Sequence, residues 1–212
     1  MKIAAYTNPY ELKFETEIIN RLFREGLNEL HIRKPDYTKE EYIKFIEKID
    51  AVHHPKLILH SYFSLIHRFN ISSLYLDAEW RKKYIFKIFL RKFILKGKSV
   101  KKYAMAHSLH SILDKKEQVD EYLLGPVFAK ATAQINNPIM DLAKLEKKLE
   151  ITEMPVSAIG GVGLDTIHFF KNVGFKGVVL QSAIWKAIDP IKAFIEIRDF
   201  EISKQQELRI VG

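Results

Sequence analysis

Two adjacent glycines, Gly160 and Gly161, are the residues whose type and position most clearly indicate chemistry. They end a short apolar segment and precede a helix-like one. Because glycine has no Cβ, backbone N–H groups can approach an anion closely there, and a following helix adds its positive end. Gln181 and Ser182 end the next apolar segment. We therefore predict a phosphate site at Gly160, Gly161, Gln181 and Ser182. The alternative is an ordinary glycine-rich turn.

Charged and titratable side chains end the earlier apolar segments. Arg33 and Lys34 follow the second segment, where they could bind an anionic substituent or simply line a solvated rim. His60 follows the third segment and Asp77 the fourth, with Glu79 close behind. Imidazole and carboxylate groups are metal ligands, so a metal site at His60, Asp77 and Glu79 is a further alternative.

The elements that must position these residues alternate along the chain. Short β-like runs are followed repeatedly by longer helical patterns. We predict strands at residues 2–7, 29–33, 56–60, 73–77, 103–108, 121–128, 155–160 and 177–182. Helices are predicted at residues 17–25, 39–49, 63–69, 112–119, 140–149 and 164–173. A last helix starts at Asp189-Pro190 and runs to about Arg198, and the tail of residues 203–212 is expected to be loosely held.

Eight such units favour a single-domain α/β protein, a closed (β/α)₈ TIM barrel that spans residues 1–212. An open doubly wound sheet has the same alternation and is the competing fold. In either fold, ligands bind at the carboxyl ends of the strands. The predicted phosphate site lies at this edge, after strands seven and eight.

Four motifs occur in an order that resembles one family over nearly the whole chain. They are Leu30-His31-Ile32-Arg33, Leu124-Gly125-Pro126-Val127-Phe128, Pro155-Val156-Ser157-Ala158-Ile159-Gly160-Gly161 and Ser182-Ala183-Ile184. Together they are similar to the thiamine phosphate synthase/TenI family. The resemblance implies an enzyme of thiamine biosynthesis that binds a thiazole phosphate.

The synthases of this family join hydroxymethylpyrimidine pyrophosphate to a thiazole phosphate and release pyrophosphate with Mg²⁺. The resemblance implies aspartates after strands three and four as the magnesium ligands. This sequence has His60-Ser61 and Asp77-Ala78-Glu79 there, so the carboxylates are missing from their expected places. The family's Thr-x-Thr-Lys loop falls on residues 130–133, which retain only Thr132 of that pattern. Lys130 and Thr132 are the substrate-binding candidates there.

The TenI branch resembles a thiazole tautomerase, which moves a proton and needs no metal. Ser108-Leu109-His110 matches the tautomerase's Ser-Val-His segment, and His31 also matches the TenI pattern. His110 is then the predicted general base, since imidazole exchanges protons near neutral pH. The substrate-binding candidates are His31, Arg33, Lys34, His60, Ser108, Lys130 and Thr132.

Three functions stay open, and we favour the first. It is a metal-independent thiazole tautomerase without a cofactor. The second is a divergent thiamine phosphate synthase that holds Mg²⁺ through Asp77 or Glu79. The third is a protein that binds a phosphorylated ligand without catalysis.

Composition limits the class of protein and its partners. The chain has 212 residues, no cysteine and a formal charge of +8. It lacks a signal-peptide pattern and any apolar run of the roughly 20 residues that a membrane span needs, so we expect a cytoplasmic protein. The basic stretch from Arg81 to Lys102 could hold nucleic acid or lie on a membrane. We favour a packed helix with solvated cations, and expect a small phosphorylated heterocycle as partner, with a homo-oligomer left open.

Overall fold

The apolar segments form strands that pair in chain order. The computed structural model describes residues 1–78, 99–113, 119–128 and 140–210, and of residues 201–210 only the backbone. The strands are β1 (Lys2–Tyr6), β2 (Glu29–Ile32), β3 (Leu57–Leu59), β4 (Ser73–Tyr75), β5 (Lys101–Ala106), β6 (Glu121–Leu124), β7 (Val156–Ile159) and β8 (Gly177–Leu180).

All eight strands are parallel, and the sheet closes on itself. Each strand pairs with its neighbour in the sequence, and β1 pairs with β8 in the register Lys2 to Gly177 and Ala4 to Val179. This closure confirms the predicted barrel and excludes the open doubly wound sheet. The carboxyl ends of all eight strands therefore meet at one opening, which we call the mouth.

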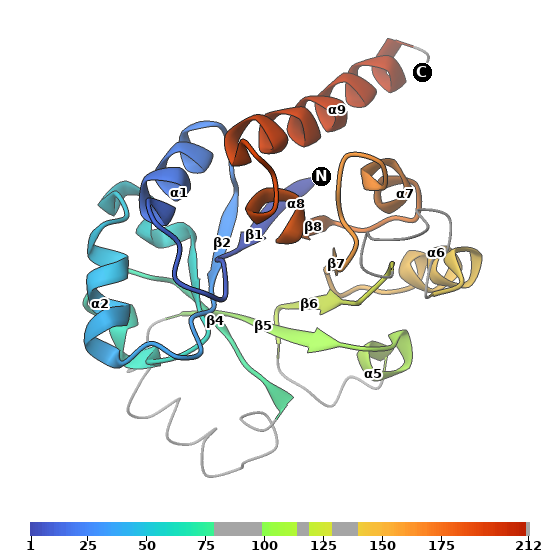
Figure 1. Ribbon diagram of the computed structural model, residues 1–212. Coiled ribbons are helices and arrows are strands. Elements are labelled where there is room, and N and C mark those ends of the chain that lie inside the picture. Colours follow the sequence, from blue (N-terminus) through green and yellow to red (C-terminus); the bar gives the residue numbers. More distant parts are fainter. Residues whose placement is uncertain (79–98, 114–118, 129–139, 211–212) are drawn as a thin grey trace.

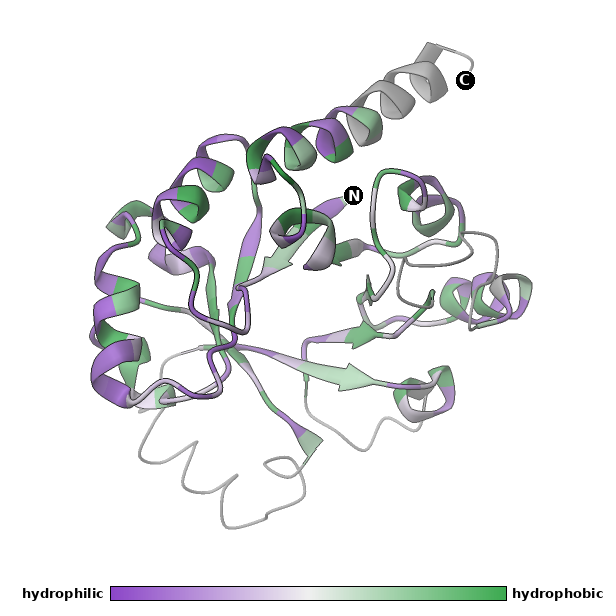
Figure 2. Ribbon diagram, in the orientation of Figure 1, coloured by the Kyte–Doolittle hydropathy of each residue, from purple (hydrophilic) through white to green (hydrophobic). Residues whose placement is uncertain are grey.

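Helices surround the barrel (Figure 1). They are α1 (Glu15–Arg24), α2 (Lys39–Glu47), α5 (Leu109–Leu113), α6 (Leu142–Glu150), α7 (Ile167–Asn172), α8 (Ser182–Trp185) and α9 (Pro190–Ile210), with 3₁₀ helices η1 (Ala51–Lys56) and η2 (Phe63–Ile66). The helices carry both polar and apolar residues (Figure 2), as expected for elements with one face on the core. Thr38 and Glu41 start α2 with a reciprocal capping box.

The strands bury side chains on both faces. Inward-pointing residues form one cluster of Ala4, Tyr6, Ile58, Tyr103, Leu123 and Val179. A larger cluster joins the outer strand faces to the helices. Because side chains alternate between the faces of a strand, the residues two positions beyond the interior cluster are the ones brought to the mouth.

Several boundaries differ from the prediction, and two of these differences have clear physical reasons. β6 ends at Leu124 and not at Phe128, because Pro126 has no N–H to donate to a sheet. The last helix runs to Ile210, beyond the end predicted at about Arg198. Residues 204–209 are good helix formers without Gly or Pro.

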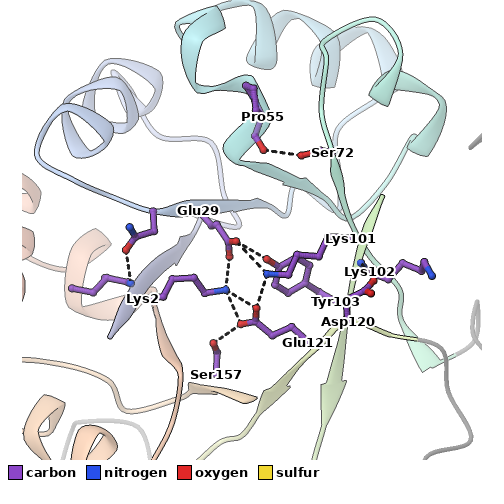
Figure 3. Close-up of polar contacts among 12 residues, drawn as sticks. Lys2, Glu29, Pro55, Ser72, Lys101, Lys102, Tyr103, Asp120, Glu121 and Ser157 are labelled. Carbon is purple, nitrogen blue, oxygen red and sulfur yellow. Dashed lines mark hydrogen bonds and ion pairs between the residues drawn. The ribbon is translucent and has the colours of Figure 1, made fainter. Parts of the chain in front are cut away.

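A network of polar side chains closes the amino-terminal end of the barrel (Figure 3). Glu121 accepts hydrogen bonds from Lys2 at 2.7 Å, from Lys101 at 2.8 Å and from Ser157 at 2.5 Å. Lys2 also contacts Glu29 at 2.7 Å. We call this the basal network, and it consists of Lys2, Glu29, Lys101, Tyr103, Glu121 and Ser157. It lies at the end of the barrel opposite the mouth.

Candidate functional site

Two histidines and a tyrosine form a stacked, hydrogen-bonded group just below the mouth. Nδ1 of His31 lies 3.1 Å from Nε2 of His60. The His60 ring stacks on Tyr75 with centroids 4.1 Å apart and planes at 8°. Tyr6 meets both imidazoles edge to face. The structure thus brings the predicted residues His31 and His60 together from two adjacent strands.

Burial makes both imidazoles neutral. It lowers the pKa of His31 well below its ordinary value, and the neighbouring His60 adds to this effect. Burial, together with the charge of Arg33, lowers the pKa of His60 to about 3. Among the described residues, Nε2 of His31 is buried without a hydrogen-bond partner. The group can therefore stack against a ring or accept a hydrogen bond, but it carries no positive charge at neutral pH.

Arg33 is the cation at this part of the mouth. Its side chain is exposed, and its charge acts on both His60 and Tyr6. The side chain of Thr7 fixes its backbone, donating to the Arg33 carbonyl at 3.0 Å and accepting from the Arg33 N–H at 2.9 Å. Arg33 thus has a fixed backbone and a guanidinium that forms no ion pair with the part of the chain that the structure describes, an arrangement that suits the binding of an anion.

The structure does not place the Lys34 side chain at the substrate contact that the sequence predicted for it. Its side chain is 0% exposed and forms a buried ion pair with Glu15. The Nζ–Oε2 distance is 2.5 Å, and the ammonium also donates to the carbonyl of Tyr10 at 2.9 Å. Adjacent residues of an extended chain point in opposite directions, so with Arg33 at the mouth Lys34 cannot share its role.

The loop after β7 has a conformation that only glycine fits. Gly160 and Gly161 have φ angles of 91° and 69°. A Cβ on Gly160 would lie 2.7 Å from Cβ of Pro126, and one on Gly161 would lie 2.4 Å from Cβ of Phe128. The glycines are therefore needed for packing against the loop after β6, whether or not an anion binds their N–H groups.

The loop after β7 lies beside the start of α8. Cβ built on Gly163 would contact Cβ of Ala183 at 3.9 Å. Ser182, the first residue of α8, is exposed and Gln181 is half-buried. Trp185 ties α8 to β1, since its indole N–H donates to the Tyr6 carbonyl at 2.7 Å. The predicted phosphate residues are thus gathered at the side of the mouth where β7, β8 and β1 adjoin.

Ser108 and His110 stand at the beginning of α5, and both are exposed. Ser111 donates its hydroxyl to the Ser108 carbonyl at 2.6 Å. Within the described residues, no hydrogen bond or ring contact links His110 to the histidines at the mouth. The predicted base is accessible to a ligand, but its placement gives no further support to a catalytic role.

The predicted metal ligands form only part of a site. Asp77 is exposed, and His60 is engaged with His31 and Tyr75. No group of three His, Cys, Asp or Glu residues that could hold a metal occurs in the part of the chain that the structure describes. Glu79, Lys130 and Thr132, with most of the basic stretch, lie outside the described residues.

Four residues at or near the mouth were not predicted from the sequence. Tyr6 and Tyr75 supply aromatic surface, Thr7 holds Arg33, and Thr166 donates to the Gly161 carbonyl at 2.7 Å. The strand periodicity could have indicated the tyrosines, because Tyr6 lies two positions after Ala4 and Tyr75 two positions after Ser73, on the same face of each strand. Thr7 and Thr166 act through loop geometry that the sequence does not reveal.

A closed parallel barrel with a cation, stacked rings and a glycine turn at its mouth defines the class of protein, a (β/α)₈ barrel. The family model described as thiamine monophosphate synthase matches residues 7–184. The chain therefore belongs to the thiamine phosphate synthase/TenI family, which confirms the resemblance seen in the motifs.

Curated relatives match over part of their length. A thiamine-phosphate synthase of Pyrococcus furiosus is 32% identical over 96 residues, which are 45% of this chain and 46% of that protein. One of Laribacter hongkongensis is 38% identical over 71 residues, 33% of this chain and 34% of that protein. One of Synechococcus is 32% identical over 94 residues, 44% of this chain and 26% of the relative. The chain thus matches less than half of each relative.

Two solved structures share the fold over nearly the whole chain. A thiamine phosphate pyrophosphorylase from Bacteroides thetaiotaomicron has a TM-score of 0.77 and 22% identity, covering 95% of this chain and 98% of that one. One from Pyrococcus furiosus has a TM-score of 0.75 and 21% identity, covering 94% of each chain.

Among the described residues, no helix has the length and hydrophobicity of a membrane span.

Proposed function

We propose that the protein catalyses the synthase reaction, joining hydroxymethylpyrimidine pyrophosphate to a thiazole phosphate with release of pyrophosphate. The family match over residues 7–184 carries this proposal, and the curated relatives are thiamine-phosphate synthases. The sequence motifs alone favoured the tautomerase. The names of the family and of the curated relatives favour the synthase instead.

The mouth suggests how the two substrates would bind. The thiazole phosphate would lie against the backbone N–H groups at Gly160 and Gly161, with the hydroxyl of Ser182 as a further donor. Arg33 would bind the pyrophosphate of the other substrate through charge-assisted hydrogen bonds and stabilise the charge that develops as it leaves. The stacked pair His60 and Tyr75 offers a flat, neutral surface for the pyrimidine ring.

Magnesium fits these described residues poorly. Mg²⁺ prefers carboxylate, phosphate and water oxygens in octahedral geometry, and it would polarise the leaving pyrophosphate in a synthase. At the end of β3 this chain offers His60, whose Nε2 bonds to His31. Asp77 supplies one exposed carboxylate. We therefore assign no step to the ion.

A thiazole tautomerase is the second candidate, and the Ser108-Leu109-His110 segment favours it. Its reaction needs a base that removes and returns a proton, and it needs no metal. His110 is exposed on α5 and could reach a ligand at the mouth. A protein that binds thiazole phosphate without turnover is the third outcome.

One assay separates these functions. The protein is incubated with both synthase substrates, with and without Mg²⁺, while thiamine phosphate and pyrophosphate are followed. A synthase yields equal amounts of both products, and Arg33→Ala lowers kcat/KM about 10- to 100-fold because a charge-assisted bond is lost. Arg68→Ala is the control, since Arg68 pairs with Glu47 on the surface at 2.6 Å.

Other results would replace the proposal. Proton exchange on the thiazole carboxylate without pyrophosphate release, abolished by His110→Ala, would indicate the tautomerase. A rise in melting temperature with thiazole phosphate, and no turnover of any substrate, would indicate the binding protein.

A further inference from the structure

The segment between β1 and α1, residues 8–14, has little packing to hold it at the mouth. Asn8 and Pro9 are half-buried and the other five residues are exposed, with Tyr10 at 76% and Phe14 at 59%. A cavity of about 440 Å³ separates residues 11–14 from α2. This loop, dark blue in Figure 1, therefore depends on polar contacts for its position.

The buried ion pair supplies those contacts. Oε2 of Glu15 accepts a hydrogen bond from Nζ of Lys34, and Oε1 accepts one from the backbone N–H of Asn8 at 2.9 Å. Lys34 also donates to the Tyr10 carbonyl at 2.9 Å. The pair is thus bonded to the backbone of the loop on both sides of Pro9.

Stability gives a weak reason for such a pair. Taking two charges out of water costs several kcal/mol each, and apolar replacements of a buried pair are often neutral. The Lys34 ammonium lies 5.2 Å from the Tyr37 ring centre and 5.1 Å from that of Phe45, so an apolar side chain could pack in its place. A specific geometry explains the charges better.

The geometry links the loop to the cation of the mouth. Lys34 directly follows Arg33, and Thr7 directly precedes Asn8. Thr7 holds the backbone of Arg33 through two hydrogen bonds. Glu15 in turn bonds to Asn8, which follows Thr7, and to Lys34, which follows Arg33. We propose that Glu15 and Lys34 are positioning residues that fix residues 8–14 and Arg33 relative to each other, so that Arg33 meets the anionic group of the substrate. This inference rests on the proposed function for the identity of that group.

The test compares two double variants of the full chain. Glu15→Leu with Lys34→Met removes both charges at similar volume, so the melting temperature should stay within a few degrees of wild type. Hydrogen exchange at the Asn8 amide and tryptic cleavage after Lys13 should each become at least 10-fold faster, because the loop loses its tethers. The Kd for inorganic pyrophosphate should rise about 10-fold, the loss of roughly one charge-assisted hydrogen bond.

The second variant, Glu15→Lys with Lys34→Glu, keeps an ion pair but reverses donor and acceptor. Lysine at position 15 cannot accept from Asn8, and glutamate at position 34 cannot donate to Tyr10. We expect it to show the same fast exchange and weak binding, whereas a merely structural pair would be restored.

Unchanged exchange and cleavage in the first variant would overturn the inference. So would a loosened loop with unaltered pyrophosphate affinity, since Arg33 would then not depend on the pair. A wild-type protein that does not bind pyrophosphate would instead refute the proposed function and the ligand given to Arg33, while the exchange data would still decide what holds the loop.

Discussion

At the scale of residues, the two glycines after β7 have a steric role as well as a proposed chemical one. Gly160 and Gly161 both have positive φ angles and both lie against the loop after β6. An L-residue at either place would be strained and would collide with Pro126 or Phe128. Their presence is therefore not by itself proof of an anion site.

Gly161→Ala should destabilise the protein by about 2–4 kcal/mol, because a positive φ and an overpacked contact act together. Gly163→Ala is the matched control in the same loop, since its added Cβ would meet nothing nearer than 3.9 Å. Urea denaturation measures both changes. Equal stability of the two variants would mean that the loop after β6 moves at little cost to make room for the added Cβ, and the steric argument would be wrong.

Among the elements, the basal network joins side chains from β1, β2, β5, β6 and β7. Glu121 on β6 is 4% exposed and binds side chains from β1, β5 and β7. Burial alone would raise its pKa, but the ammonium groups of Lys2 and Lys101 outweigh this and lower it. The network closes the barrel opposite the mouth, so we expect it to affect stability more than ligand binding.

Glu121→Gln should lower the free energy of unfolding by about 3 kcal/mol, because the ammonium groups of Lys2 and Lys101 then share Glu29 and lose their buried carboxylate partner. Lys144→Met is the control, since its pair with Asp141 at 3.3 Å is 80% and 52% exposed and should contribute far less to stability. Denaturant titration gives both values. Similar losses in the two variants would contradict the role of the network.

At the scale of the whole molecule, two buried groups make the fold sensitive to acid in the same direction. His60 has a pKa of about 3 in the folded protein and about 6.5 in the unfolded chain. Between these values only the unfolded chain takes up the proton, so stability falls as the pH falls. The pKa of Glu121 is lowered by folding, so its contribution is present above its ordinary pKa and is lost as the pH falls through the folded value.

Unfolding by urea at pH 7, 5.5 and 4.5 should therefore give steadily lower stability. His60→Asn should reduce the slope between pH 7 and 4.5, because asparagine does not titrate. A histidine proton resonance of His60 that titrates near pH 6.5 would refute the assigned burial and the slope together.

The amino-acid sequence alone predicts the alternation of strands and helices, the family motifs, and the placing of Arg33, His60 and the glycines at strand ends. These follow from local periodicity and from residue types that permit few backbone conformations. The closure of the sheet is visible only in the folded protein, since strand pairing between residues 2 and 177 is not encoded locally. The fold also shows that Lys34 pairs with Glu15 and that His31 and His60 share a hydrogen bond. Both outcomes depend on which side chains from distant segments meet in the interior, and desolvation there changes what a lysine or histidine can do.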